Sequence, residues 1–190
     1  MSIKVIVRFV CVWVLSIPLL AVGTPASATP EGPTRGVATF QGTVIDLKDG
    51  WWGAQSCVVW AGRRAECFAT HEEADVLLGY SRQADALYQE GARSSGGAGS
   101  LAVPACASGW LCLYEHANGG GRRLIFSDEY WHYLSEWGFD RQTSSWRNNQ
   151  GSADVGHLSL YNSGSVYNCG SRSYANSMGS ANDQAYAVWG

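Results

Sequence analysis

The feature that most constrains the fold is a repeat in the C-terminal half of the chain. Leu111-Cys-Leu-Tyr114 recurs as Leu158-Ser-Leu-Tyr161, and a turn rich in Gly, Asn or Ser follows each copy. Residues 139–146 and residues 181–188 form a second, weaker repeat. Each unit of about 40 residues is too small to bury a core alone. The repeat therefore predicts an all-β sandwich of two similar units over residues 101–190.

The N-terminal half has a different pattern, that of a small α+β region. Cys57–Trp60 and Ala65–Phe68 are short apolar runs on either side of a turn, which indicates a β-hairpin. Thr70 followed by Glu73 forms a capping box, and the apolar spacing after it predicts a short helix that ends at Gly79.

The first residues have the pattern of a secretory signal peptide. Two basic residues precede the apolar run Phe9–Leu20, and Ala26-Ser-Ala28 is a small-x-small cleavage signal. The apolar run is shorter than the ~20 residues that a membrane-spanning helix needs. We therefore expect cleavage before Thr29, secretion to the extracellular space, and no membrane association once the signal peptide is removed.

Composition divides the chain into five expected segments. The run Ala92–Ser100 is rich in Gly and Ser, which favours a flexible linker and a domain boundary. The segments are a signal peptide (1–28), a disordered tail (29–36), the small α+β region (37–90), the linker (91–100) and the β domain (101–190).

The cysteines favour local disulfide bonds in an oxidising compartment. Cys106 and Cys112 bracket a tight turn that contains Gly, and Cys57 and Cys67 bracket the predicted hairpin. Local pairing leaves Cys169 over, although a bridge from Cys169 to either pair stays open. No His lies at ligand spacing from any Cys, so a metal-thiolate site is disfavoured.

Charge and motifs exclude several functions. Asp and Glu number 16 against 13 Lys and Arg, and two of the basic residues lie in the leader, which argues against nucleic acid as a partner. None of the four His residues lies in a recognisable catalytic motif, and Gly-x-Ser-x-Gly and His-Glu-x-x-His are both absent. We therefore predict that the chain is not an enzyme. The C-terminal half holds more Trp than its core needs, so some are expected at the surface as anchors for a partner.

Residues 106–128 and 137–146 resemble the actinomycete peptidase inhibitor family typified by the Streptomyces metalloproteinase inhibitor. The hairpin pattern from Tyr114 to Gly121 is similar, more distantly, to the Greek-key unit of βγ-crystallins. The resemblance implies a βγ-crystallin-like inhibitor domain at 101–190. It also implies an extracellular protease as partner, in particular a thermolysin-like zinc metalloprotease.

The similarity to βγ-crystallins also shows where a calcium motif would lie. Arg141 stands where an oxygen ligand is expected in the first copy, and Tyr186 removes a hydroxyl ligand from the second. We therefore expect no bound metal and no cofactor, with calcium as the alternative. The degenerate motif positions are Asp140, Ser144, Asn182 and Asp183.

Two functional hypotheses follow. The first is a secreted inhibitor whose rigid, disulfide-braced β domain blocks a protease cleft. The candidate contact loops are the one between Cys106 and Cys112 and the hairpin Glu115–Gly121, and no single inhibitory contact residue is predicted. The alternative is a non-inhibitory βγ-crystallin-like module that binds calcium or a cell-wall glycan, or that acts as a toxin-like factor.

Overall fold

The computed structural model describes residues 36–61, 64–94 and 103–190. The predicted signal peptide and its cleavage site lie outside the described residues, as do most of the predicted tail and most of the predicted linker. No helix in the described ranges is long and apolar enough to cross a membrane.

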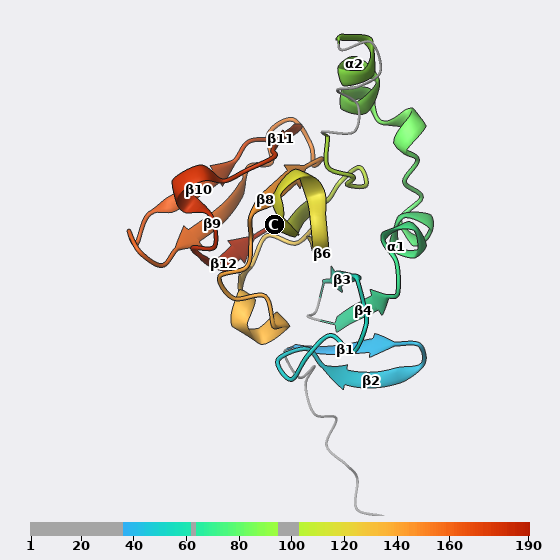
Figure 1. The fold of residues 1–190 in the computed structure, drawn as a ribbon, viewed down its shortest axis with the longest axis vertical. Coiled ribbons are helices and arrows are strands. Elements are labelled where there is room, and N and C mark those ends of the chain that lie inside the picture. Colours follow the sequence, from blue (N-terminus) through green and yellow to red (C-terminus); the bar gives the residue numbers. More distant parts are fainter. Residues whose placement is uncertain (1–35, 62–63, 95–102) are drawn as a thin grey trace, which may run out of the picture. The chain divides into compact units, whose positions relative to one another are not determined.

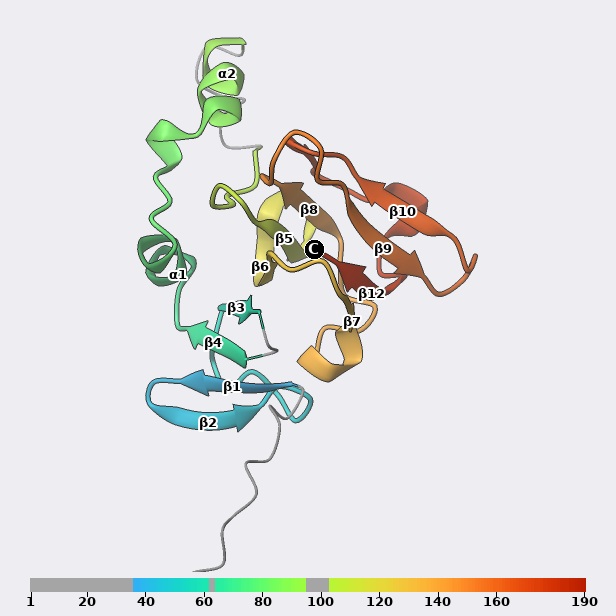
Figure 2. The same cartoon turned by 180° about the vertical axis from the view of Figure 1, so that it is seen from behind.

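The C-terminal half contains two units of four strands, and each unit gives its third strand to the sheet of the other (Figures 1 and 2). One sheet contains the order β11-β8-β5-β6 and the other has the order β10-β9-β12-β7. This exchange confirms the predicted all-β sandwich of two similar units. The first unit comprises β5 (Leu111–His116), β6 (Gly120–Phe126), β7 (Trp131–Tyr133) and β8 (Ser145–Asn148). The second comprises β9 (Gly156–Leu160), β10 (Val166–Cys169), β11 (Ser173–Ala175) and β12 (Ala185–Trp189).

A reciprocal pair of backbone hydrogen bonds joins the two units. The Arg141 N–H donates to the Ala185 carbonyl over 2.8 Å, and the Asp183 N–H donates to the Thr143 carbonyl over 3.1 Å. Arg141 and Asp183 both have left-handed backbone conformations, with φ of 55° and 56°. These residues hold equivalent places in the weaker sequence repeat, so that repeat reflects an approximate two-fold relation between the units.

The N-terminal half adds strands to the first sheet. Its β3 (Ser56–Trp60) pairs in parallel with β6, and the sheet continues through β4 (Arg64–Phe68) and β1 (Val37–Phe40) to β2 (Thr43–Asp46). The sequence predicts a domain boundary at residues 91–100, but strands from both sides of it share one sheet, and Glu31–Gly190 forms one compact unit. Parallel strands need a long connection between them, and the described helices lie in the stretch of chain that joins β4 to the C-terminal half.

The helical segment follows β4. In α1 (His71–Leu77), the Thr70 Oγ1 accepts the Glu73 N–H over 3.1 Å, and Gly79 ends the helix with φ of 63°. This confirms the predicted short helix. A short 3₁₀ turn, η1 (Arg82–Ala84), leads to α2 (Ala86–Ser94), which the sequence analysis missed and which extends into the predicted linker. The other 3₁₀ turns are η3 (Ala117–Gly119), η4 (Leu134–Trp137) and η5 (Gly179–Ala181).

The core lies between the two sheets and is dominated by large side chains. Trp137 and Phe139 are fully buried, and they pack with residues of both sheets. Trp51 joins this core from the N-terminal half and donates its indole N–H to the Trp137 carbonyl over 2.9 Å. Gly138, with φ of 59°, approaches the Leu47 carbonyl so closely that a Cβ would lie 2.1 Å from that oxygen. The N-terminal half is therefore built into the core of the sandwich.

Candidate functional site

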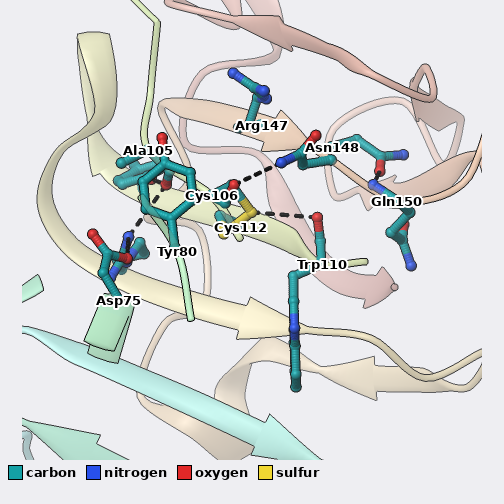
Figure 3. The surroundings of a disulfide bond; sticks show 12 residues. Asp75, Tyr80, Ala105, Cys106, Trp110, Cys112, Arg147, Asn148 and Gln150 are labelled. Carbon is teal, nitrogen blue, oxygen red and sulfur yellow. Dashed lines mark hydrogen bonds and ion pairs between the residues drawn. A yellow bond between two sulfur atoms is a disulfide. The ribbon is translucent and has the colours of Figure 1, made fainter. Parts of the chain in front are cut away.

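The first candidate contact loop is closed by a disulfide between Cys106 and Cys112 (Figure 3). Asn149 holds this loop from the other side. Its side-chain amide donates to the Cys106 carbonyl over 2.8 Å, its N–H donates to the Trp110 carbonyl over 2.9 Å, and its carbonyl accepts the Gly109 N–H over 2.8 Å. Only Ser108 and Gly109 of the loop are well exposed. The loop is rigid, but it presents little surface to a partner.

Loss of the Cys106–Cys112 disulfide should lower the free energy of unfolding by about 2 kcal/mol, because a closed loop restricts the unfolded chain. The double substitution C106A/C112A, compared by urea unfolding with wild type, measures this. Cys169→Ala is the matched control, since Cys169 is a buried free thiol. If C106A/C112A costs no more than that control, the bridge does not brace the domain.

The other cysteines also have defined places. Cys57 and Cys67 face each other across β3 and β4 and form the second disulfide. The thiol of Cys169 is fully buried, and burial raises its pKa. Both cysteine pairs favoured by the sequence are thus disulfides in the structure, and Cys169 is left over.

The second candidate loop, the hairpin Glu115–Gly121, ends in an exposed turn of His116, Ala117 and Asn118. The Ser145 hydroxyl braces the turn, because it donates to the His116 carbonyl over 2.6 Å and accepts the Gly119 N–H over 3.0 Å. Asn118 has φ of 59°, and its N–H donates to the Asn176 carbonyl over 2.8 Å. The turn is therefore both exposed and held in one conformation.

An ion pair closes the base of this hairpin. Arg122 donates to both carboxylate oxygens of Glu115, over 2.9 Å from Nη2 and 3.0 Å from Nε. The guanidinium holds the pKa of Glu115 below its usual value. The guanidinium carbon also lies 4.9 Å from the centre of the Trp51 ring, within cation–π range. The base of the hairpin is thereby fixed to the N-terminal half.

The structure does not bring the two candidate loops together. The exposed tip Ser108–Gly109 precedes β5 and the turn His116–Asn118 lies at its far end, so the length of this strand of six residues separates the two tips. At about 3.3 Å per residue this is a distance of about 20 Å. The two loops are therefore separate candidate contacts, and each needs its own test.

A third exposed turn was missed by the sequence analysis. Residues 161–165, between β9 and β10, are all exposed. This turn begins at Tyr161, the repeat partner of Tyr114, and the Glu115–Gly121 hairpin begins directly after Tyr114. The repeat was the signal that could have identified it.

The degenerate calcium positions are only partly brought together. The Ser144 hydroxyl donates to Asp183 Oδ1 over 3.1 Å, and the Asn182 amide donates to Asp183 Oδ2 over 2.7 Å. Asp140 instead lines a surface hollow beside Tyr161. Neutral donors thus occupy both oxygens of the Asp183 carboxylate, and no group of three His, Cys, Asp or Glu in the described ranges could hold a metal ion. A calcium site needs six or more oxygen ligands. That the chain binds no metal ion stays a prediction.

Two buried arginines of the β domain form ion pairs with aspartates of the helical segment. Arg123 Nη1 lies 2.8 Å from Asp75 Oδ1, and Arg147 Nη2 lies 2.9 Å from Asp85 Oδ1. Asp85 also accepts the Tyr80 hydroxyl over 2.9 Å. Buried charges are costly unless paired. The sequence left the role of residues 37–90 open. In the structure, one role of this region is to neutralise the two buried arginines.

The histidines differ in their surroundings. His132 Nε2 lies 2.7 Å from Asp128 Oδ1, and its buried ring packs against Phe126 and Trp137. Burial lowers the pKa of His71, and the nearby guanidinium of Arg123 lowers it further. Neither arrangement orients a histidine toward a Ser or Cys side chain among the described contacts. That the chain is not an enzyme stays a prediction.

The tryptophans of the C-terminal half are divided between core and surface. Trp137 and Trp146 are buried, whereas Trp131 is 40% exposed. Trp110 packs edge-on against Trp60 with ring centres 5.3 Å apart, and Trp131 packs in the same way against Trp189 at 5.8 Å. The surplus of tryptophan therefore places aromatic side chains at the surface of the second sheet.

Comparison with known proteins adds two findings. Residues 100–169 match the model of peptidase inhibitor family I36, which confirms the resemblance drawn from residues 106–128 and 137–146. The chain is also similar to a solved structure described as "Evolution of the eye lens beta-gamma-crystallin domain fold". That similarity has 17% identity and a TM-score of 0.37, and it covers 44% of this chain and 86% of the other. No curated protein matches the chain.

Proposed function

We propose that this chain is a secreted peptidase inhibitor, and the observation that carries the proposal is the match of residues 100–169 to peptidase inhibitor family I36. Two disulfides support the extracellular location, because such bonds persist in oxidising compartments. The chain acts by binding and not by catalysis. Its target is a zinc metalloprotease of the thermolysin type, the class that the family resemblance implies.

The mechanism is occlusion of the peptidase cleft by a preorganised turn. A loop that is already ordered loses little conformational entropy on binding, so rigidity strengthens inhibition. The His116–Asn118 turn has three exposed residues, whereas the Cys106–Cys112 loop has two. The Ser145 hydroxyl and the Asn176 carbonyl also hold the turn from outside the hairpin. We therefore assign the contact to the tip of this turn.

The function is tested by titrating thermolysin with the oxidised chain from Thr29 to Gly190, with subtilisin as the serine-protease control. We expect a stoichiometric loss of thermolysin activity that added zinc does not reverse. If the chain only removed zinc from the peptidase by chelation, added zinc would restore the activity. If neither peptidase loses activity up to micromolar protein, the proposed function is wrong. Inhibition of subtilisin alone would keep the inhibitor but refute the target class.

The contact turn is tested by placing a bulky charge at its tip. Ala117→Arg should weaken inhibition about 100-fold, the size of effect seen when a central interface residue is disrupted. Ser108→Arg and Ser163→Arg place the same side chain in the two other loops and should leave the inhibition constant within about threefold of wild type. If either of these weakens inhibition more than Ala117→Arg, the contact lies in that loop instead.

A further inference from the structure

Figure 2 shows the sheet β10-β9-β12-β7. Strand register gives its outer face two rows of side chains that the proposed function does not use. Strand register places Trp131, Trp189, His157 and Asn168 side by side in one row. The next row is Tyr133, Ala187, Ser159 and Val166. Neighbouring residues of the same strands, such as His132, Val188 and Leu158, are buried in the core. Because side chains alternate along a strand, the two rows face away from the core.

These rows contain aromatic and neutral polar side chains together with the aliphatic Ala187 and Val166, and they contain no Lys, Arg, Asp or Glu. Trp131 is 40% exposed and Tyr133 is 54% exposed. His157 Nδ1 lies 2.9 Å from Asn168 Oδ1, so the polar end of the first row is ordered. Exposed Trp and Tyr side chains gathered on one face of a small protein indicate a binding surface.

A surface hollow of about 410 Å³ continues this face at one end, and Tyr133 belongs to both. Its other aromatic walls are Tyr161 and Tyr186, and Asp140 and Ser135 supply polar groups. The Arg141 guanidinium lies 4.8 Å from the centre of the Tyr161 ring, which holds that exposed ring in place. A volume of this size lies within the range of small-molecule sites. We call Trp131, Tyr133, Tyr161, Tyr186 and Trp189 the aromatic face.

We propose that the aromatic face binds a neutral polysaccharide, independently of peptidase inhibition. Sugar rings present C–H groups that pack on aromatic faces, while their hydroxyls need neutral donors and acceptors such as Asn168, Ser159 and Ser135. The lack of formal charge on the two rows matches an uncharged polymer. It does not suit nucleic acid or an anionic membrane, which require a basic surface.

The test uses cellohexaose and chitohexaose as probes, titrated into the oxidised chain and followed by tryptophan fluorescence and by calorimetry. Saturable binding of one of these neutral sugars is expected, with no binding of a sulfated polysaccharide. Trp131→Ala and Tyr161→Ala should each weaken it about tenfold or more, as the loss of a stacking anchor does. Tyr174→Ala and Trp52→Ala remove exposed aromatic side chains outside the aromatic face and should leave binding unchanged.

Three results would overturn the proposal. The first is the absence of saturable binding of either neutral sugar at millimolar concentration. The second is concentration-dependent dimerisation of the wild type that Trp131→Ala abolishes, which would make the face a contact between copies. The third is loss of thermolysin inhibition in Trp131→Ala and Tyr161→Ala variants whose thermal unfolding is unchanged, which would assign the face to the peptidase. If the wild type does not inhibit thermolysin but binds one of the sugars, the proposed function is wrong and the sugar-binding proposal stands.

Discussion

Replacement of Arg123 by methionine will lower the free energy of unfolding by about 3–5 kcal/mol, the range for breaking a buried ion pair. The Arg123 side chain is fully buried, and its guanidinium contacts Asp75, the Ser56 hydroxyl over 2.8 Å and the His71 carbonyl over 2.8 Å. Methionine fills similar space but leaves the Asp75 carboxylate without its partner. Urea unfolding at neutral pH measures the loss.

Two comparisons separate this effect from general damage. The double variant R123M/D75L removes both charges and should recover most of the loss, because apolar replacement of a buried pair is often nearly neutral. Lys48→Ala breaks the exposed pair between Lys48 and Asp46 and should leave the free energy of unfolding nearly unchanged, because solvent screens that pair. An R123M loss as small as that of Lys48→Ala would show that the buried pair does not hold the two halves together.

The pH dependence of R123M has a defined sign. Burial already raises the pKa of Asp75, and the Arg123 guanidinium opposes this rise. Without Arg123 the folded-state pKa is higher still, so the folded variant binds a proton more readily than the unfolded chain does. Its deficit relative to wild type should therefore shrink as the pH falls from 7 toward 4. A deficit that grows on acidification contradicts this account.

Trp137→Ala should also destabilise the protein by about 3–5 kcal/mol, because it empties a large site at the centre of the sandwich. Trp137 is fully buried, and its ring centre lies 6.4 Å from that of Phe126 and 5.9 Å from that of His132. Trp137→Phe should cost much less, since it keeps a ring and removes an indole N–H that has no hydrogen-bond partner in the described structure.

The matched control for Trp137 is Trp52→Ala. Trp52 is 68% exposed, so Trp52→Ala should change the free energy of unfolding by no more than about 0.5 kcal/mol. Thermal unfolding of Trp137→Ala, Trp137→Phe and Trp52→Ala under the same conditions shows which substitution destabilises the protein most. Equal losses for Trp137→Ala and Trp52→Ala would mean that Trp137 does not anchor the core.

The sandwich could be predicted from the sequence because its signal is local. Residues 111–114 and 158–161 repeat within short segments, and the turns around them carry their own Gly and Asn. The helix at Thr70 was predictable for the same reason, since its cap uses residues three positions apart. The helix α2 has a cap too, where Asp85 Oδ1 accepts the Leu87 N–H over 3.0 Å. That cap was overlooked because no apolar spacing drew attention to it.

The union of the two halves could not be predicted, because it depends on contacts between residues far apart in the chain. Nothing near Asp75 or Asp85 in the sequence indicates that each faces a buried arginine of the β domain. The candidate loops show the same limit. Their composition suggested exposed turns, but only the structure shows that the exposed part of the first loop is limited to Ser108 and Gly109 and that β5 separates these residues from His116–Asn118.

The parallel pairing of β3 with β6 has a consequence for how the chain folds. The hairpin of β3 and β4 can form early, because its strands are adjacent and the Cys57–Cys67 bond joins them. Its neighbour in the sheet, β6, is synthesised much later, and pairing across so long a loop is slow. Until β6 pairs with it, the edge of β3 has unpaired backbone N–H and C=O groups that can pair with strands of other chains. We expect newly synthesised chains to need protection from aggregation until β6 has paired with β3.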